Sequence, residues 1–471
     1  MKEGNEGRVL GADSMQRSAV PSPLPGRTSS GSAPRRPTGD LLDVVVKMAA
    51  EGLVRIASGE FLLASDPDEP FGRLFGRDSM VTSLQLLSAA RLAPSLAPLL
   101  LPPVEGSLRA LARLQGVMDD PWTEEEPGKI LHEHHPRGSG DFPGAYYASV
   151  DSTPLFLMAL HRYAEAAPTI QPAILDELRD ARDRALAWIL RRGDLDADGL
   201  VEFVQRNPER RSLINQNWRD SRDSLLLPDG SMPRYPVAYS EVQAYCYAAV
   251  EGEARLRWDE EPAMAGELSV RARQLARRFE RLFWLEGTGC YAQALDADKH
   301  PIPDVTSNAF HWLWLGPLRH RRFRRVASRL LCADMMTPFG LRTLSSASPN
   351  YAPLRYHRGA IWPWDNWVAA SALRRLGMEE AAAAVDEAVM RGLSHLGSPA
   401  EMYVYRDGGD CPSTSFVDIQ GGPARACRIQ GWTVGYLVEM AARWGGAEML
   451  LDELSRRHWR RGGAPAVSDA V

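Results

Sequence analysis

Two acidic residues that lie far apart in the sequence could together hydrolyse a glycosidic bond. Asp220 follows Trp218 in the segment NQNWRDSRDS (215–224), and Glu401 lies in PAEMY (399–403). Glycoside hydrolysis needs one protonated carboxyl, which donates to the leaving oxygen, and a second carboxylate on the other side of the bond. A neighbouring aromatic ring raises the pKa of a carboxyl by desolvation, which suits Asp220 as the donor. The alternative is that Asp220 caps a helix or turn, as Asp-Ser pairs often do.

Four further segments combine carboxylates with aromatic rings, and all but the third also contain cations: FGRDSM (75–80), GKILHEHH (128–135), YYASVDSTPLF (146–156) and YHRGAIWPWDNW (356–367). Asp78 opens a helical pattern and could be a first-turn acid only. With Arg77 beside it, the pair could also hold vicinal sugar hydroxyls by charge-assisted hydrogen bonds. His132 and Glu133 begin like the zinc motif HExxH, but Pro136 stands where the second histidine belongs. No zinc site is therefore predicted.

The segment DLDADG contains a possible calcium-binding turn. Asp194, Asp196 and Asp198 have the spacing of the first half of an EF-hand loop, but Gln205 occupies the twelfth position, where a glutamate is needed. The other interpretation is a tight turn rich in Asp and Gly. A single structural calcium ion is kept as the weaker of the two alternatives.

The composition argues against several classes of partner. The 471 residues include 55 Lys and Arg against 60 Asp and Glu, a net charge of −5, which disfavours nucleic acid and anionic lipid. The chain has no apolar run of eighteen residues, which argues against a membrane span. Its five scattered cysteines lack CxxC spacing, so we expect a reducing, cytoplasmic location.

Helical periodicity dominates the chain between two polar ends. Residues 1–38, rich in Ser, Pro, Gly and Arg, are expected to form a disordered leader, and 459–471 a flexible tail. The domain between them, 39–458, has apolar residues at three- and four-residue spacing in about a dozen segments. We expect helices near 41–57, 76–91, 104–116, 151–166, 171–192, 240–258, 262–285, 307–315, 318–332, 358–377, 379–396, 427–443 and 446–458. The runs EFLLAS (60–65) and CYAQALDA (290–297) are strand-like. No fixed repeat of the TPR or HEAT kind is present.

These motifs, in this order, resemble the catalytic domain of amylo-α-1,6-glucosidases and bacterial glycogen-debranching-like proteins. That group is related to trehalases and mannosylglycerate hydrolases. The resemblance spans roughly residues 40–445 and also rests on GDLDADG (193–199) and DGSMPRYPVAYSEVQAY (229–245). It implies an all-α fold, an (α/α)6 barrel of six helical hairpins with minor β-hairpins in the loops. It further implies an inverting glycoside hydrolase without a cofactor, which acts on an oligosaccharide or a small glycoside.

The resemblance also implies roles for individual residues. By likeness, Asp220 is the general acid and Glu401 the general base that activates water. The remaining expected contributors to the sugar subsite are Arg77, Asp78, His132, Glu133, Tyr146, Asp151, Trp218, Glu241, Gln243, His357, Arg358, Trp362 and Asp365. Three positions depart from the usual pattern: Ala400 stands where proline commonly precedes the glutamate, Asn217 replaces a glycine, and WPWDN replaces WPHDN.

The main hypothesis is hydrolysis of α-glucosidic bonds of the glycogen-debranching type. An alternative within enzymes is a hydrolase of a small compatible-solute glycoside, such as glucosylglycerate or mannosylglycerate, whose carboxylate an arginine could bind. An alternative from another class is a catalytically silent carbohydrate-binding barrel, since a fold does not dictate an activity. A helical-repeat interaction protein is disfavoured because periodic repeats are absent.

Overall fold

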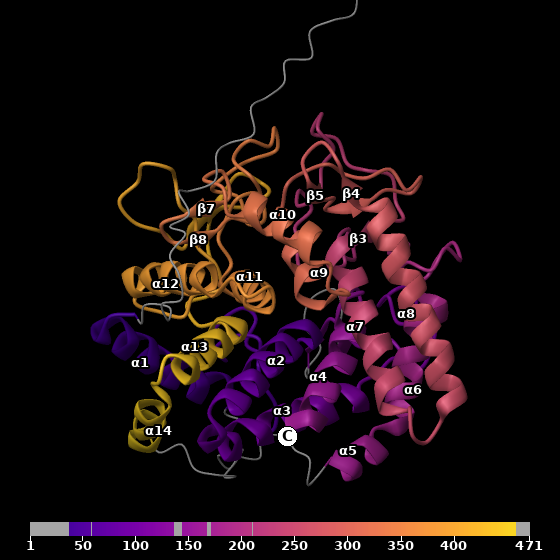
Figure 1. Ribbon diagram of the computed structural model, residues 1–471, viewed down its shortest axis with the longest axis horizontal. Helices are drawn as coiled ribbons and strands as arrows, with labels where there is room; N and C mark the ends of the chain where they lie inside the picture. Colours follow the sequence, from indigo (N-terminus) through magenta and orange to yellow (C-terminus); the bar gives the residue numbers. More distant parts are fainter. Residues whose placement is uncertain (1–36, 58, 136–143, 167–170, 210, 458–471) are drawn as a thin grey trace, which may run out of the picture.

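The computed structural model describes residues 37–57, 59–135, 144–166, 171–209 and 211–457. The expected tail and all but two residues of the expected leader lie outside these ranges. The described part is mostly helical (Figure 1). Its α-helices are α1 (Gly39–Ile56), α2 (Gly76–Leu92), α3 (Ala97–Arg113), α4 (Ser152–Ala166), α5 (Gln171–Glu177), α6 (Arg179–Ala187), α7 (Ser240–Leu256), α8 (Pro262–Leu282), α9 (Ala309–Leu315), α10 (His320–Leu330), α11 (Pro363–Arg375), α12 (Glu379–Leu396), α13 (Gly431–Arg443) and α14 (Ala447–Arg456).

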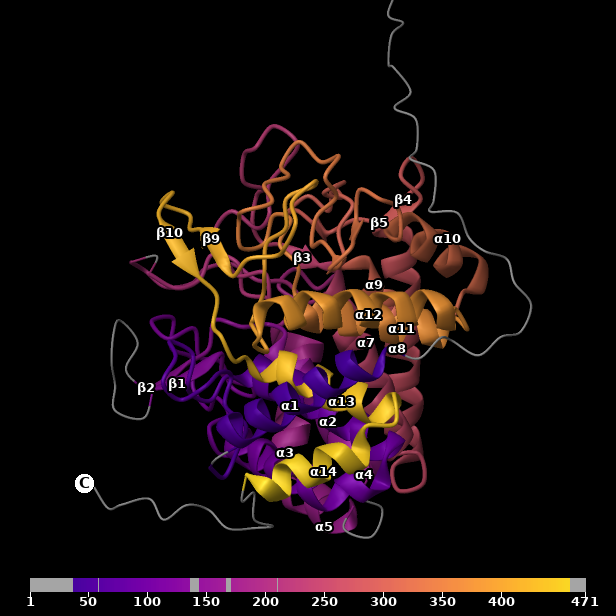
Figure 2. The ribbon, with the colours of Figure 1, turned by 90° about the vertical axis from the view of Figure 1, so that its left-hand side faces the viewer.

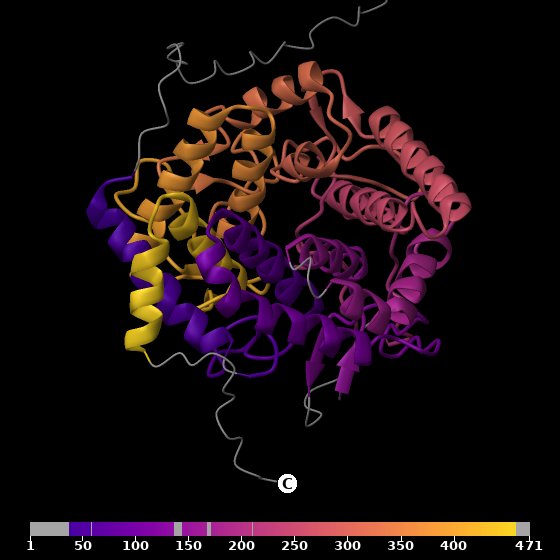
Figure 3. The same ribbon diagram turned by 60° about the horizontal axis from the view of Figure 1, so that its bottom comes forward.

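Six of the helices in these ranges form a closed inner ring. In order around the ring they are α2, α4, α7, α9, α11 and α13; each packs against the next, and α13 packs back against α2. An outer layer of α1, α3, α6, α8, α10 and α12 surrounds them, as the view along the ring shows (Figure 3). This arrangement of six inner and six outer helices confirms the predicted (α/α)6 barrel.

The two layers differ in sequence because they differ in exposure. Outer helix α8 buries Ala265, Leu268, Ala272, Ala276 and Phe279, a single stripe at three- and four-residue spacing. Inner helices α2 and α13, by contrast, are buried on nearly every side.

The inner helices approach one another closely where their side chains are small. A Cβ atom at Gly435 of α13 would lie 2.3 Å from the side-chain oxygen of Gln85 on α2. Glycine at this position therefore allows α13 to pack closely against α2.

Short two-stranded sheets decorate the loops at one end of the barrel (Figure 2). All of the pairs in the described ranges are antiparallel. They join β1 (Glu133–His135) to β2 (Gly144–Tyr146), β3 (Ala238–Tyr239) to β6 (Ala294–Leu295), β4 (Trp284–Leu285) to β5 (Cys290–Tyr291), β7 (Met336–Thr337) to β8 (Gly340–Leu341), and β9 (Ser415–Val417) to β10 (Pro423–Arg425). No helix in the described ranges is both long and apolar enough to cross a bilayer.

The predicted helices agree with the structure except at some ends and at 171–192, which divides into α5, α6 and a π-helical turn at Trp188–Arg192. Helix α11 begins at Pro363 rather than near 358, because proline fits the first helical turn and Gly359 before it has φ +134°. Helix α3 begins at Ala97 rather than near 104, and it contains Pro102 and Pro103. The segment CYAQALDA contributes β5 and β6, whereas EFLLAS forms no strand, and only Ser65 makes an isolated bridge, to Gln430.

Candidate active site

The amino ends of the inner helices meet at one end of the barrel. Each end carries a buried polar residue in its first turn or directly before it: Asp78, Asp151, Glu241, Asn308, Asp365 and Gln430. Hydrogen bonds connect these ends; Gln430 donates to Asp78 Oδ1 over 3.0 Å, from α13 to α2. The amino end of a helix carries partial positive charge, so this convergence provides a favourable environment for carboxylates and polar ligands.

A cavity of about 740 Å³ opens above this ring of helix ends. Its walls combine acids, cations and aromatic rings: Arg73, Phe75, Arg77, Asp78, His132, Glu133, Trp218, Asp220, Arg222, Arg355, Tyr356, Trp362, Glu401, Phe416, Arg425, Cys427 and Trp432. Both predicted catalytic acids, Asp220 and Glu401, therefore line the same cavity. Its size lies within the range of small-molecule sites.

The buried side chain of Arg219 holds the loop that carries Asp220 in place. Arg219, fully buried, donates to Asn308 Oδ1 over 2.7 Å and to the carbonyl of His357 over 2.6 Å. The side chain of Asp220 is 24% exposed, and Oδ2 lies 3.2 Å from Nη2 of Arg77. Burial raises the pKa of Asp220 to about 6, because Arg77 offsets the desolvation only in part.

Glu401 accepts two hydrogen bonds from other parts of the chain. The hydroxyl of Tyr356 donates to Oε1, and the backbone N–H of Cys427 donates to Oε2 over 3.1 Å. Burial raises the pKa of Glu401 to about 7, although both donors favour the carboxylate. The negative charge of Asp220 raises the pKa of Glu401 further, so the protonation states of the two acids are linked.

A third carboxyl, that of Asp78, also lines the cavity. Burial raises its pKa to about 7. Its Oδ2 atom is buried without a hydrogen-bond partner in the described structure and lies 3.6 Å from Nε of Arg77. Arg77 is itself buried between Asp78, Asp151 and Asp220. An oxygen left unpaired in such a cavity is costly unless a ligand donates to it, which fits the expected contact with a sugar hydroxyl.

Aromatic rings form the wall between the two catalytic candidates. Trp218 meets Trp362 edge to face at 5.6 Å, and Trp362 meets Tyr356 in the same way at 4.8 Å. Trp432 completes this wall at 5.7 Å from Trp362. Such apolar faces suit the C–H surfaces of a sugar ring and exclude water from the acids.

Several of the predicted contributors lie behind the cavity wall rather than in it. His132, Glu133, Trp218 and Trp362 line the cavity together with Arg77 and Asp78, whereas seven others do not: Tyr146, Asp151, Glu241, Gln243, His357, Arg358 and Asp365.

These seven residues support the cavity from outside. His357 stacks on Trp362 at 4.8 Å. Asp151 accepts from Ser149, and the Tyr146 hydroxyl accepts from the backbone of Leu213. The other four make these contacts: Glu241 accepts from Asn217, Gln243 binds the backbone of Val201, Arg358 donates to the carbonyl of Asn350, and Asp365 contacts His311.

Some residues that line the cavity were not predicted from the sequence. Tyr356 lies within the motif YHRGAIWPWDNW but is not among the predicted site residues, and its hydroxyl donates to Glu401. Cys427 precedes α13 by four residues, and only the folded chain brings its backbone N–H to Glu401. Arg222 and Arg425 line the cavity and are exposed.

The DLDADG loop forms a tight turn with its own internal contacts. Asp194 accepts backbone hydrogen bonds from Asp198 and Gly199 at 2.9 and 2.8 Å. The ammonium of Lys299 contacts Asp196, Asp198 and Glu202. Because this ammonium already supplies a positive charge beside those carboxylates, the turn is stable in the form described. Binding of calcium there stays a prediction.

The comparisons with known proteins point to glycoside hydrolases. Residues 254–417 match the family model of the mannosylglycerate hydrolase MGH1-like glycoside hydrolase domain. The prediction of a glycoside hydrolase is confirmed. No curated protein sequence matches the chain.

Solved structures of glycosidases share the fold. A GH63 mannosylglycerate hydrolase from Thermus thermophilus, in complex with Tris and D-glycerate, is 18% identical, with a TM-score of 0.61 over 84% of this chain and 99% of that one. The same hydrolase with glucose gives 17% identity and a TM-score of 0.58 over the same shares. A rhamnosidase from Klebsiella oxytoca with rhamnose bound is 16% identical, with a TM-score of 0.57 over 88% and 66%. Glycogen-debranching specificity stays a prediction, since none of these matches bears on it.

Proposed function

We propose that the chain is an inverting glycoside hydrolase that cleaves a small glycoside with an acidic aglycone, of the mannosylglycerate or glucosylglycerate type. The observation that carries this proposal is the meeting of Asp220 and Glu401, each with a raised pKa, in one cavity of about 740 Å³. The matched domain is of the mannosylglycerate hydrolase type, and one structural neighbour holds D-glycerate. The small-solute alternative is therefore preferred to α-1,6-glucosidase activity.

The two acids have complementary tasks in this proposal. Asp220 donates its proton to the glycosidic oxygen while the bond to the anomeric carbon breaks. Glu401 accepts a proton from the water that attacks this carbon from the opposite face. The two donors that reach Glu401 favour its ionised form. Because the pKa values of Asp220 (about 6) and Glu401 (about 7) lie close together, a fraction of the molecules carries the proton on Asp220 and the charge on Glu401.

Arginines at the cavity mouth suit an acidic aglycone. Arg222 and Arg425 line the cavity, and in the described ranges neither makes an ion pair or a side-chain hydrogen bond. A guanidinium that is not neutralised can bind a carboxylate through two parallel hydrogen bonds. The buried Arg77 is less suited to this task, because three aspartates already surround it.

A substrate panel with detection of the product anomer by NMR tests the proposal. We expect turnover of mannosylglycerate or glucosylglycerate with inversion, and little turnover of isomaltose or branched dextrin. The double variant Arg222→Gln/Arg425→Gln should raise KM for the acidic glycoside but not for the methyl glycoside of the same sugar. Retention of configuration would overturn the assigned mechanism. Binding without product release would favour a silent carbohydrate-binding barrel.

A further inference from the structure

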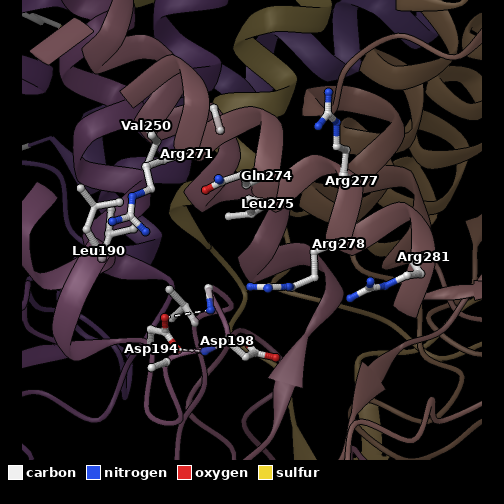
Figure 4. Close-up of a pocket in the computed structure, with 15 residues that line it drawn as sticks. Leu190, Asp194, Asp198, Val250, Arg271, Gln274, Leu275, Arg277, Arg278 and Arg281 are labelled. Carbon is white, nitrogen blue, oxygen red and sulfur yellow. Dashed lines mark hydrogen bonds between the residues drawn. The ribbon is translucent and has the colours of Figure 1, made fainter. Parts of the chain in front are cut away.

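A second cavity lies on the outer layer of the barrel, away from the residues that line the catalytic cavity. It has a volume of about 520 Å³ and is formed between α8, the π-helical turn at Trp188–Arg192 and the loop that follows it (Figure 4). Leu190, Val250 and Leu275 give it an apolar floor. None of its lining residues belongs to the catalytic cavity.

Arginines of α8 dominate the lining of this cavity. Arg271, Arg278 and Arg281 follow one another at seven- and three-residue spacing, which places them on one face of the helix. In the close-up, Arg271 extends toward Leu190, and Arg278 extends toward the loop of Asp194 and Asp198 (Figure 4). Within the described part of the chain, none of these three guanidiniums has an ion pair or a side-chain hydrogen bond.

Three acids near these arginines, Asp194, Asp198 and Glu280, are already engaged elsewhere. Both oxygens of Asp194 accept backbone N–H groups, and Asp198 binds the backbone N–H of Leu200 and the ammonium of Lys299. Glu280, on the same helix, contacts Arg322. In a protein of net charge −5, this is therefore a local concentration of cations that the fold does not neutralise.

The loop approaches the arginines closely and so shapes the cavity. Gly199 has φ +86°, and a Cβ atom there would lie 2.4 Å from Nη1 of Arg278. The positive φ favours glycine at this position. The loop therefore lies directly against the guanidinium of Arg278 at the cavity wall.

We propose that this cavity, which we call the α8 arginine site, binds a small anionic molecule that carries at least two phosphoryl or carboxylate groups. Guanidinium groups bind both kinds of anion through paired hydrogen bonds. One anionic group would lie between Arg278 and Arg281. A second would contact Arg271, about 10 Å further along the helix axis at 1.5 Å per residue. The volume of about 520 Å³ and the apolar floor favour a small molecule over a polymer.

Calorimetry and thermal unfolding of the full chain test this site. The probes are inorganic pyrophosphate and citrate, which separate phosphoryl from carboxylate recognition, with sodium chloride at equal ionic strength as the control. We expect at least one probe to bind with a measurable Kd, and at ten times that Kd to raise Tm by about 1–3 °C. Chloride should not reproduce the rise.

A matched pair of variants decides whether the arginines are responsible. Arg271→Ser/Arg281→Ser changes two exposed residues that line the cavity, and it should weaken Kd at least about tenfold. Arg273→Ser changes an exposed arginine of the same helix that does not line it, and it should leave Kd unchanged. Equal weakening by both variants, or binding no tighter than that of chloride, would overturn the proposal. Because neither variant touches the catalytic cavity, glycoside hydrolysis should persist in both.

Discussion

Replacing Tyr356 with Phe tests the role of Glu401 with the loss of a single oxygen atom. The hydroxyl of Tyr356 donates to Glu401 Oε1, while its ring packs edge to face on Trp362. The Phe ring keeps this packing, so the change is confined to the hydrogen bond. Because that bond stabilises the carboxylate, its loss should raise the pKa of Glu401 above the value of about 7.

The expected size of the effect follows from the energy of the bond. A hydrogen bond to a charged group contributes about 1.5–3 kcal/mol, and one pKa unit corresponds to about 1.36 kcal/mol. For a general base, the ratio of wild-type to variant kcat/KM should thus be about 10–100 below pH 6 and should approach 1 above about pH 10. The assay is kcat/KM across this pH range, together with circular dichroism to verify the fold.

The pH dependence of this ratio distinguishes the expected result from two others. A fall in kcat/KM that is equal at every pH would mean that Tyr356 only supports the wall. A variant that is favoured at alkaline pH would make Glu401 the acid rather than the base, and either result would refute our reasoning. Tyr351→Phe is the control, because its buried hydroxyl has no hydrogen-bond partner in the described structure. The ratio of wild-type kcat/KM to that of this control variant should stay near 1 at every pH.

Three further substitutions give separate tests. Asp220→Asn removes the proposed proton donor and should lower kcat/KM by about 10²–10⁴ with unchanged circular dichroism; near-normal turnover would refute the assignment. Asp78→Asn removes a carboxyl whose pKa is raised to about 7, so that the folded protein holds this proton more tightly than the unfolded chain. Wild-type stability should therefore fall relative to this variant as the pH rises from about 4 to 7, measured as the difference in Tm; a constant difference would contradict it. Gly76→Ala places a Cβ atom 2.1 Å from the carbonyl oxygen of Leu131, and denaturant titration should show a loss of about 1–3 kcal/mol. Gly39→Ala, which meets no atom within 4 Å, is its control and should stay within about 0.5 kcal/mol.

The helices were largely predictable because their signals are local. The apolar stripe of α8 predicted 262–285, and the helix runs from Pro262 to Leu282. The predicted helix ends were wrong where a proline can either begin a helix or lie inside one. Pro363 starts α11, whereas Pro102 and Pro103 lie inside α3 and do not delimit it. Closure of the ring could not come from periodicity, because it depends on contacts such as that of Gly435 with Gln85.

The candidate site was predictable only as a set of motifs. Resemblance placed Asp220 and Glu401 together, and both line the same cavity. The motifs could not show which of their side chains reach it. In YHRGAIWPWDNW the conspicuous His357 lies behind the wall, whereas Tyr356 beside it contacts Glu401. Neighbouring side chains in this turn point in different directions, so one of them reaches the cavity and the other lies behind its wall, although both rings contact Trp362.

The same architecture explains why the carboxyls have pKa values near neutrality. The converging helix ends and the guanidinium of Arg77 favour carboxylates, whereas burial behind the tryptophans favours the protonated form. The balance brings the pKa of Asp220 to about 6 and those of Asp78 and Glu401 to about 7. An inverting hydrolase needs one acid protonated and the other ionised at the same time, and this requirement is met most readily when both pKa values lie near the working pH. A more exposed pair would lose both protons, and a fully apolar pocket would retain both. The depth of the cavity above the helix ends is therefore what would permit the proposed acid and base chemistry in one site.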